Sequence, residues 1–415
     1  MTDEKRRILD LAARHVCPHR VEMLQGLGVD LVIGRREGYR IWDVDGRELL
    51  DFHLNGGVFN LGHRNPEVID ALRQGLETLD IGNHHFPSPA RAELAAALVA
   101  TAPGTQYAVF APSGGEAIEI AIKSARHATQ RRAVVSIRNG YHGHTGLALA
   151  AGDERAAALF LSQGAAGEFV HVPFNDLAAM AAALAGDDVA AVVVETIPAT
   201  SGFPLPEPGY LPGVKALCER HGAMYIADEV QTGLGRTGHW WAVQRFGVQP
   251  DILVTGKGLS GGIYPIAAAL LAPRAAGWLQ SDGWGHVSTF GGAELGCRVG
   301  LKVLEITARP EVLRNVAAVS ERLGAGLEVL RRQYGDWLVE VRRCGVVMGL
   351  RFANPRGAML MAKHLYDAGI WAMFAGFDPS VLQFKAGMLI DAAYCDEALT
   401  RFADGLRRCT AALAG

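Results

Sequence analysis

Cysteine is scarce in this sequence, with six residues in a chain of 415, and no two of them form a Cys-x-x-Cys pair. They are Cys17, Cys218, Cys297, Cys344, Cys395 and Cys409. Cysteines scattered in this way argue against a zinc site and against a disulfide framework, and they are typical of a protein from a reducing compartment. We therefore expect neither a bound metal nor disulfide bonds.

Long apolar runs and long runs of like charge are also missing. No uncharged apolar run reaches the ~18 residues that a membrane-spanning helix needs. The N-terminal stretch MTDEKRRILDLAARHV lacks the continuous apolar segment of a secretory signal. The formal net charge is -3, and the charge pattern favours neither nucleic acid nor a membrane surface as a partner. The sequence predicts a soluble cytoplasmic protein.

Hydrophobic residues make up 49% of the chain, and their spacing predicts an α/β protein. Short β-branched runs at 133–137, 190–195, 223–228 and 251–255 alternate with Ala/Leu-rich stretches of helical spacing. Strands that are apolar throughout and alternate with helices indicate a mostly parallel central sheet with helices on both faces.

The two ends of the chain have a different texture. Residues 38–52 alternate apolar and polar residues around an Asp-Gly turn, which predicts a hairpin. After residue 295 a long helical stretch is expected, with a kink or restart at Pro310. Residues 339–353 and 381–390 resemble strands of a smaller α+β domain. The predicted division is an N-terminal segment at 1–65 contributing to the small domain, a large domain at 66–300 and a C-terminal small domain at 301–415.

Polar residues gather where the predicted strands end, which is where ligands bind in an open parallel sheet. Glu195 and Asp228 end two strands, Tyr141 and His142 follow a third, and Lys257 follows residues 251–255. Each also has an ordinary structural explanation. Asp228 could cap a helix, Glu195 could belong to a buried pair, and Tyr141 and His142 could be packing and turn residues.

Lys257 is unusual among the seven lysines because it alone sits at a glycine-flanked strand end, in DILVTGKGLSGG. A buried ammonium is costly unless it is paired or neutralised, and burial lowers the pKa of the amine towards nucleophilic competence. Upstream, a Ser113-Gly114-Gly115 turn before a predicted helix offers backbone N–H groups to an anion. Pyridoxal phosphate needs a Schiff-base lysine, an acid on its pyridine nitrogen, a stacking ring and a phosphate site, and this set of residues suits it.

The chain also resembles the class III aminotransferases among the fold type I pyridoxal-phosphate enzymes. Motifs that match this family, in order, are GYRIWDVDGRELLDFHLNGGVFNLGHRNPEV, SGGEAIEIAIKSAR, YHGHT, DEVQTGLGRTG, PDILVTGKGLSGGIYPIAA and HVSTFGG. The resemblance covers nearly the whole chain. It implies a fold type I transferase with pyridoxal 5'-phosphate as cofactor, a small-molecule amine donor and carbonyl acceptor, and a homodimer with shared active sites.

The resemblance implies a role for individual residues. Lys257 would form the Schiff base and move the proton between substrate and cofactor, and Asp228 would keep the pyridine nitrogen protonated. Val230 would pack on the ring face opposite Tyr141, and Gln231 would bond the ring oxygen. Thr289 would reach the phosphate bound in the partner subunit. The full expected cofactor-binding set is Ser113, Gly114, Gly115, Tyr141, His142, Glu195, Asp228, Val230, Gln231, Lys257, Ser288 and Thr289.

Two departures from the family concern the substrate. Thr200, in ETIPATSGF, stands where members that process amino acids often carry a second glutamate. Gln383, in VLQFKAGML, stands where those members have an arginine that grips the substrate carboxylate, and Lys385 is the nearest cation. We expect these three residues to contact the substrate. Without the arginine, the reacting group is expected to be a distal or primary amine rather than a standard α-amino group.

The leading interpretation is therefore a ping-pong transaminase that works in two half-reactions. Alternatives that keep the cofactor are an aminomutase of the glutamate-1-semialdehyde type, a racemase or epimerase, and a decarboxylating relative. An aminomutase would need no second substrate. A catalytically silent cofactor-binding or scaffold protein is the alternative from another class, and the intact Lys257 and Asp228 argue against it.

Overall fold

A computed structural model of the chain describes residues 1–186 and 188–414. Its main feature is a seven-stranded sheet in the order β4-β10-β9-β8-β7-β5-β6. The strands are β4 (Tyr107–Ala111), β5 (Ala133–Ile137), β6 (Phe169–Val172), β7 (Val189–Glu195), β8 (Met224–Asp228), β9 (Ile252–Thr255) and β10 (Ala267–Leu271). Only β10 runs antiparallel to its neighbours β4 and β9, and the other pairs are parallel. The mostly parallel sheet predicted from the sequence is confirmed.

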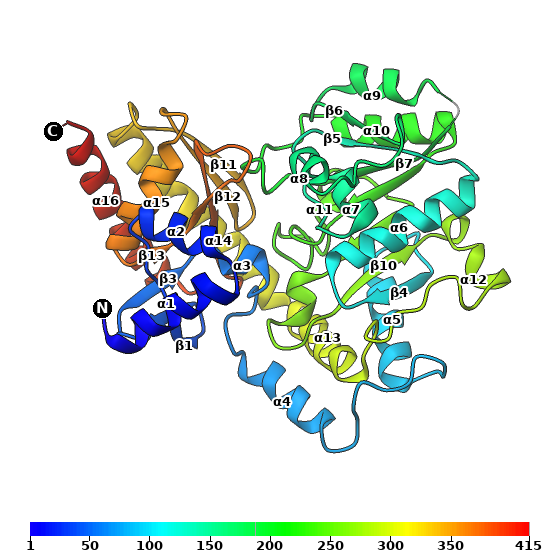
Figure 1. The fold of residues 1–415 in the computed structure, drawn as a ribbon, viewed down its shortest axis with the longest axis horizontal. Coiled ribbons are helices and arrows are strands. Elements are labelled where there is room, and N and C mark those ends of the chain that lie inside the picture. The colour runs from blue at the N-terminus through cyan, green and yellow to red at the C-terminus, as the bar shows by residue number, and fades with distance from the viewer. Residues whose placement is uncertain (187, 415) are drawn as a thin grey trace.

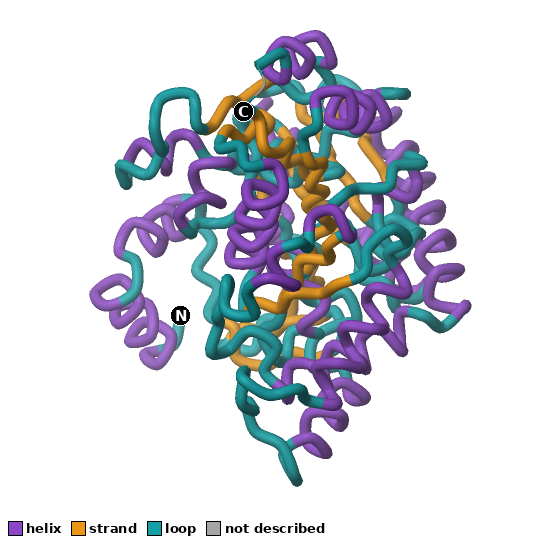
Figure 2. The backbone as a smooth tube through the Cα atoms, turned by 90° about the vertical axis from the view of Figure 1, so that its right-hand side faces the viewer, coloured by secondary structure: helices purple, strands orange, loops and turns teal. Residues whose placement is uncertain are grey.

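Both faces of this sheet are covered, and β7 shows why its sequence is apolar throughout. Val192 and Val194 join a core with residues of α5 (Pro89–Thr101), α9 (Leu177–Leu184) and α10 (Tyr210–His221). The intervening Val193 joins a second core with α6 (Gly114–Thr129) and α7 (Gly146–Ala151). Since successive side chains of a strand point to opposite faces, a strand between two helical layers needs no polar face. Figure 2 shows strands inside and helices outside.

Two smaller four-stranded sheets complete the fold. One is β1 (Ile33–Glu37), β2 (Arg40–Asp43), β3 (Glu48–Asp51) and β13 (Ile370–Trp371), and the other has the order β11-β12-β15-β14. The latter strands are β11 (Leu338–Cys344), β12 (Val347–Phe352), β14 (Met373–Phe374) and β15 (Val381–Lys385). Because β3 pairs with β13, the two ends of the chain share a sheet, and both termini lie on the same side of the molecule (Figure 1).

The helices agree with the expected restart at Pro310. Helix α13 (Glu294–Thr307) ends before α14 (Pro310–Gln333), which begins at the proline itself, where a missing N–H costs nothing. The other helices are α1 (Asp3–His15), α2 (Pro18–Gly26), α3 (Leu54–Gly57), α4 (Pro66–Gly75), α8 (Glu154–Leu159), α11 (Ala242–Arg245), α12 (Trp278–Ser281), α15 (Gly357–Asp367) and α16 (Ala392–Ala414). Within the described ranges no helix has the length and apolarity needed to cross a membrane.

The small sheets contain the expected hairpins but differ from the sequence-based expectation at the end of one strand. The hairpin predicted at 38–52 is present, with β2 antiparallel to β3, and residues 339–353 form a second hairpin that turns at Gly345. The strand expected at 381–390 is wrong at its end, because β15 stops at Lys385. Beyond it the N–H of Met388 donates to the carbonyl of Asn60 at 3.0 Å instead of to a neighbouring strand. The domain division at 65 and 300 stays a prediction, and α13 runs unbroken across residue 300.

Candidate active site

Lys257 lies just beyond the carboxyl end of β9, at the start of a short 3-10 turn, Lys257–Ser260. Its φ is +40°, a left-handed conformation that is uncommon for a residue with a side chain and that often marks a functional site. Among the described residues, its Nζ has neither a hydrogen-bond partner nor an ion-pair partner. Burial lowers the pKa of this ammonium, against the opposing charges of Asp228 and Glu195. The position favours a neutral, nucleophilic amine.

Asp228 ends the adjacent strand β8 and is held by two hydrogen bonds. Its Oδ2 lies 2.8 Å from Nδ1 of His142, and its Oδ1 accepts the N–H of Val230 at 3.0 Å. Both the aspartate and the histidine are buried. Burial alone would lower the pKa of His142, but the bond to Asp228 raises it above the ordinary value. The imidazole therefore fixes the orientation of the carboxylate.

Glu195 is paired in register with Asp228, on the neighbouring strand β7. Its Oε1 accepts the N–H of Tyr141 at 2.9 Å, and its Oε2 accepts the N–H of Ala199 at 3.1 Å. No cation pairs with it within 4 Å in the described parts of the chain, and burial raises its pKa to about 7. Glu195 thus anchors the backbone of the loop that carries Tyr141.

A cavity of about 170 Å³ lies among these strand ends. Its lining consists of Gly114, Gly115, Tyr141, His142, Gly143, Glu195, Asp228, Val230, Gln231 and Lys257. Nine of these ten residues are in the set expected from the sequence, and the structure brings them together from segments that lie far apart in the chain. Ser113 is not among the lining residues, and its hydroxyl caps α6 by accepting the N–H of Glu116 at 3.3 Å.

Sequence reasoning missed Gly143. Its φ is +121°, and a Cβ at this position would lie 2.7 Å from the Cα of Gly115. A side chain there would push into the turn that opens α6. The glycine between two histidines in YHGHT was the available signal, because a glycine beside a predicted ligand loop often marks a close approach of two backbones.

Other expected residues lie apart from this cavity. Thr289 is exposed, and Ser288 accepts the N–H of Gly291 at 3.1 Å. Thr200 is half-buried, and its carbonyl accepts the N–H of Phe377 at 3.0 Å. Gln383 and Lys385 are buried on β15, with Lys385 Nζ donating to Gln383 Oε1 at 2.6 Å.

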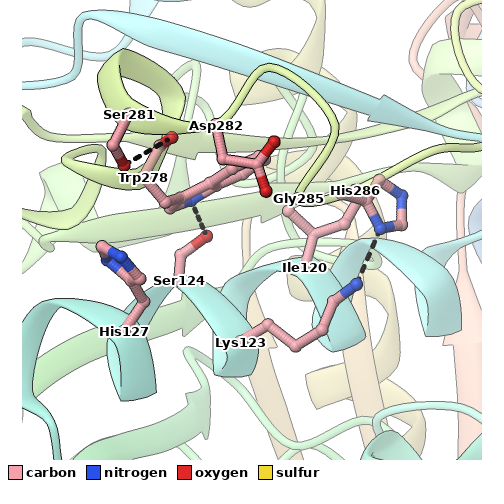
Figure 3. Close-up of a pocket in the computed structure, with 9 residues that line it drawn as sticks. All are labelled: Ile120, Lys123, Ser124, His127, Trp278, Ser281, Asp282, Gly285 and His286. Atoms are coloured by element: carbon pink, nitrogen blue, oxygen red, sulfur yellow. Dashed lines mark hydrogen bonds between the residues drawn. The ribbon is translucent and has the colours of Figure 1, made fainter.

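A second cavity of about 170 Å³ has different chemistry (Figure 3). It is lined by Ile120, Lys123, Ser124, His127, Trp278, Ser281, Asp282, Gly285 and His286. The indole N–H of Trp278 donates to Oγ of Ser124 at 3.0 Å, and Nζ of Lys123 lies 2.8 Å from Nδ1 of His286. None of the predicted site residues lines this second cavity. The candidate active site is therefore the cavity that contains Lys257.

Comparison with known proteins agrees with this geometry. The sequence profile of the Aminotransferase class-III family matches residues 25–406. The chain is 46% identical over 387 residues to an uncharacterised aminotransferase of Archaeoglobus fulgidus, covering 93% of this chain and 90% of that protein. It is 36% identical over 378 residues to the acetylornithine aminotransferase of Pseudomonas putida, covering 89% of this chain and 90% of that protein.

The chain belongs to the class III aminotransferase family. A solved structure of the ornithine aminotransferase of Toxoplasma gondii, with partial occupancy of pyridoxal phosphate at its active site, superposes on this aminotransferase with a TM-score of 0.87. The two chains are 27% identical, and the match covers 100% of this chain and 96% of that one. The protein is a pyridoxal-phosphate-dependent aminotransferase of fold type I.

The cavity of this aminotransferase fits the cofactor. The backbone N–H groups of Gly114 and Gly115 open α6 and have no acceptor within the described residues, which leaves two donors for a phosphate at a helix N-terminus. A Cβ on Gly114 would lie 3.1 Å from Cγ1 of Val230, and one on Gly115 would lie 3.2 Å from Oγ1 of Thr145. The cradle therefore suits glycine. The buried Oε1 of Gln231 also has no partner there.

Proposed function

We propose that this aminotransferase moves an amino group from an amine donor to a carbonyl acceptor by a ping-pong mechanism, and that the reacting group is a distal or primary amine. The observation that carries the second part is the side chain of Gln383. Its oxygen is bonded to Lys385 Nζ at 2.6 Å inside the protein. A neutral amide so engaged offers a substrate α-carboxylate neither the charge nor the paired donors of an arginine.

Bound pyridoxal phosphate supplies an aldehyde carbon for the amine and a ring that withdraws electrons from it. Lys257, whose pKa is lowered by burial, would hold the cofactor through that carbon and would move a proton at the substrate carbon. Asp228 would face the ring nitrogen, in the orientation set by its bonds to His142 and Val230. These roles need the buried carboxylate and the amine at neighbouring strand ends, as β8 and β9 provide.

The remaining lining residues orient the ring. Tyr141 and Val230 are proposed to hold its two faces, and Gln231 is proposed to bond its hydroxyl oxygen. The N–H groups of Gly114 and Gly115, with Ser113 at the cap, are proposed to bind the phosphate. Glu195 keeps Tyr141 in place through the backbone bond at 2.9 Å.

We propose further that two chains form a homodimer in which Thr289, with Ser288, contacts the phosphate of the partner subunit. The support is a patch of exposed apolar side chains. Phe86, Trp284, Val287 and Phe290 are 68%, 58%, 52% and 58% exposed. Arg91 ties their two segments together, bonding the carbonyls of residues 86 and 292 at 3.0 Å each. An exposed apolar patch of this kind is typical of a protein interface.

No observation favours an aminomutase, a racemase or epimerase, or a decarboxylating relative over transamination, and a silent scaffold would not need a nucleophilic Lys257. The aminomutase is separated by a simple assay, because it would turn over a single substrate without an added acceptor. A cytoplasmic location stays a prediction.

The test of the amine preference compares half-reactions. Each α-amino acid is paired with the amine formed by its decarboxylation, and the rate of conversion of the bound cofactor to its amino form is followed by absorbance. We expect the amines to react faster across the panel. The proposal fails if the α-amino acids win throughout and Gln383→Ala leaves that order unchanged. A panel in which no amine converts the cofactor would overturn the transaminase activity itself.

A further inference from the structure

A buried histidine–aspartate pair closes a loop beside the active site. Nε2 of His63 lies 2.8 Å from Oδ2 of Asp51, and both side chains are 4% exposed. The other carboxylate oxygen, Oδ1, accepts the N–H groups of His53 at 3.0 Å and of Leu54 at 2.8 Å. Asp51 therefore fixes the first residues of the loop 51–63 and, through His63, also its last residue.

The loop contains a strained turn. Residues 54–57 are four consecutive residues with positive φ, at 52°, 48°, 68° and 96°. Two of them, Leu54 and Asn55, carry side chains, for which this conformation is uncommon. A strained backbone persists only where the surrounding structure imposes it, and such strain is concentrated at functional sites. The turn therefore depends on the bonds that Asp51 and His63 make at the two ends of the loop.

The strained turn lies against Lys257. A Cβ on Gly56 would lie 3.4 Å from Cε and 3.6 Å from Nζ of the lysine. A Cβ on Gly258, the residue after Lys257, would lie 2.5 Å from Nδ2 of Asn60. Lys257 has a φ of +40°, so its own backbone is strained as well. The loop 51–63 thus contacts the lysine at its side chain and at the residue that follows it.

The amine of Lys257 is not held by bonds of its own. Its Nζ has neither a hydrogen-bond partner nor an ion-pair partner within residues 1–186 and 188–414, and Asp228 and Glu195 act on its charge without a bond. The place of the amine is then set by packing along the side chain, and the loop supplies part of that packing. Its position matters because a displacement of about 1 Å at a reacting group can lower a rate about 100-fold.

We propose that Asp51 and His63 are positioning residues for Lys257. By closing the loop 51–63 they hold the turn 54–57 against the lysine and so keep its left-handed backbone and its side chain in place. The pair acts through the loop, because the carboxylate of Asp51 bonds to the start of the loop and to His63. This inference rests on the proposed function, in which Lys257 holds the cofactor.

Two substitutions of His63 separate the pair from the rest of the loop. His63→Leu removes the partner of Oδ2 and leaves the bonds of Oδ1 to His53 and Leu54 in place. His63→Gln is the conservative variant, because its amide nitrogen can donate to Asp51 from about the position of the imidazole Nε2. Recovery in the glutamine variant would assign the effect to the bond and not to the packing of the imidazole ring.

A third variant tests the contact without changing the pair. Gly56→Ala adds a methyl group 3.4 Å from Cε of Lys257, at a φ of +68°. Gly247→Ala is its matched control, with a φ of +66° and nothing within 4 Å of the added Cβ. Both variants carry a similar backbone strain, and only the first reaches Lys257.

The first readout is hydrogen exchange, measured by mass spectrometry on the full chain without added cofactor in peptides that contain residues 54–62 and 257–260. We expect His63→Leu to raise exchange in both segments and His63→Gln to restore most of the protection. Gly56→Ala should raise exchange at 257–260, and Gly247→Ala should leave it unchanged. A pair that merely stabilises its own loop would alter 54–62 alone.

The second readout is the half-reaction of the holoenzyme with a panel of amines, followed by cofactor absorbance. In His63→Leu the maximal rate should fall roughly 10- to 100-fold while the amine concentration at half-maximal rate changes little, because the lysine is displaced and amine binding is kept. His63→Gln should recover most of the rate.

The proposal is refuted if His63→Leu leaves exchange at 257–260 unchanged. It is also refuted if Gly56→Ala and Gly247→Ala change that exchange equally, a comparison that leaves the pair intact. A loss in His63→Leu that lies in the half-saturating amine concentration alone would count against positioning of the lysine. If no amine reacts with the unaltered enzyme but exchange at 257–260 follows the pair, the proposed function fails and the positioning of Lys257 stands.

Discussion

The bond between His142 and Asp228 gives the sharpest test of how this chain controls its cofactor. Replacing His142 with leucine leaves the Oδ2 of a buried carboxylate without the partner that now lies 2.8 Å away. A hydrogen bond to a charged group contributes about 1.5–3 kcal/mol. Since 1.4 kcal/mol corresponds to a factor of ten, cofactor affinity should fall roughly 10- to 150-fold if Asp228 binds the ring nitrogen in the orientation that His142 sets.

His142→Asn is the matched variant, because its amide nitrogen can donate from about the position of the imidazole Nδ1. Cofactor dissociation constants would be measured by absorbance titration of the two variants and the unaltered enzyme. We expect the asparagine variant to recover most of the affinity lost in the leucine variant. Equal loss in both would show that imidazole packing, and not the bond, matters. Unchanged affinity in the leucine variant would refute the reasoning altogether.

The same pair has a pH signature. The bond to Asp228 raises the pKa of His142 above its ordinary value of 6.5. A group whose pKa is raised by folding contributes stability that is fully present below the unfolded value and is lost as pH rises through the folded value. The stability gap between the unaltered enzyme and His142→Leu should therefore be widest below about pH 6.5 and narrow above it, as thermal unfolding over a pH series would show.

Three further predictions follow from Lys257, Glu195 and Thr289. Borohydride should fix the cofactor to Lys257, and Lys257→Ala should lose more activity than the ~10²–10⁴-fold typical of a general base; peptide mapping of the label to another lysine would contradict this. Burial raises the pKa of Glu195 from 4.5 to about 7. As pH rises between these values, the unaltered enzyme should therefore lose stability relative to Glu195→Gln, by at most about 3 kcal/mol; parallel pH–stability curves would count against this prediction. Mixed refolding of Lys257→Ala and Thr289→Ala chains should restore part of the activity, because a hybrid dimer holds one intact site; proven hybrids without activity would exclude site sharing.

The sequence by itself determined the family, the cofactor and most of the cavity lining, because these depend on local patterns. Apolar runs placed β5, β7, β8 and β9 within a residue of their ends. The parallel sheet then required that Asp228, Glu195 and Lys257 meet at one edge. The Ser113-Gly114-Gly115 turn before α6 was equally predictable, because a helix that begins at two glycines can be recognised from the local sequence alone.

Only the tertiary structure determined which of the other charged residues are buried. Arg236 lies in the glycine-rich motif DEVQTGLGRTG, and its guanidinium is buried against the carbonyl of Gly57, 179 residues away in the chain. Lys385 lies within the strand expected at 381–390 and could have faced water, but in the structure β15 ends at this residue and its side chain is buried beside Gln383. Burial depends on which distant segments pack together. The sequence therefore shows that a charged residue is present, and only the tertiary structure shows whether its side chain is accessible to solvent or to an acidic group.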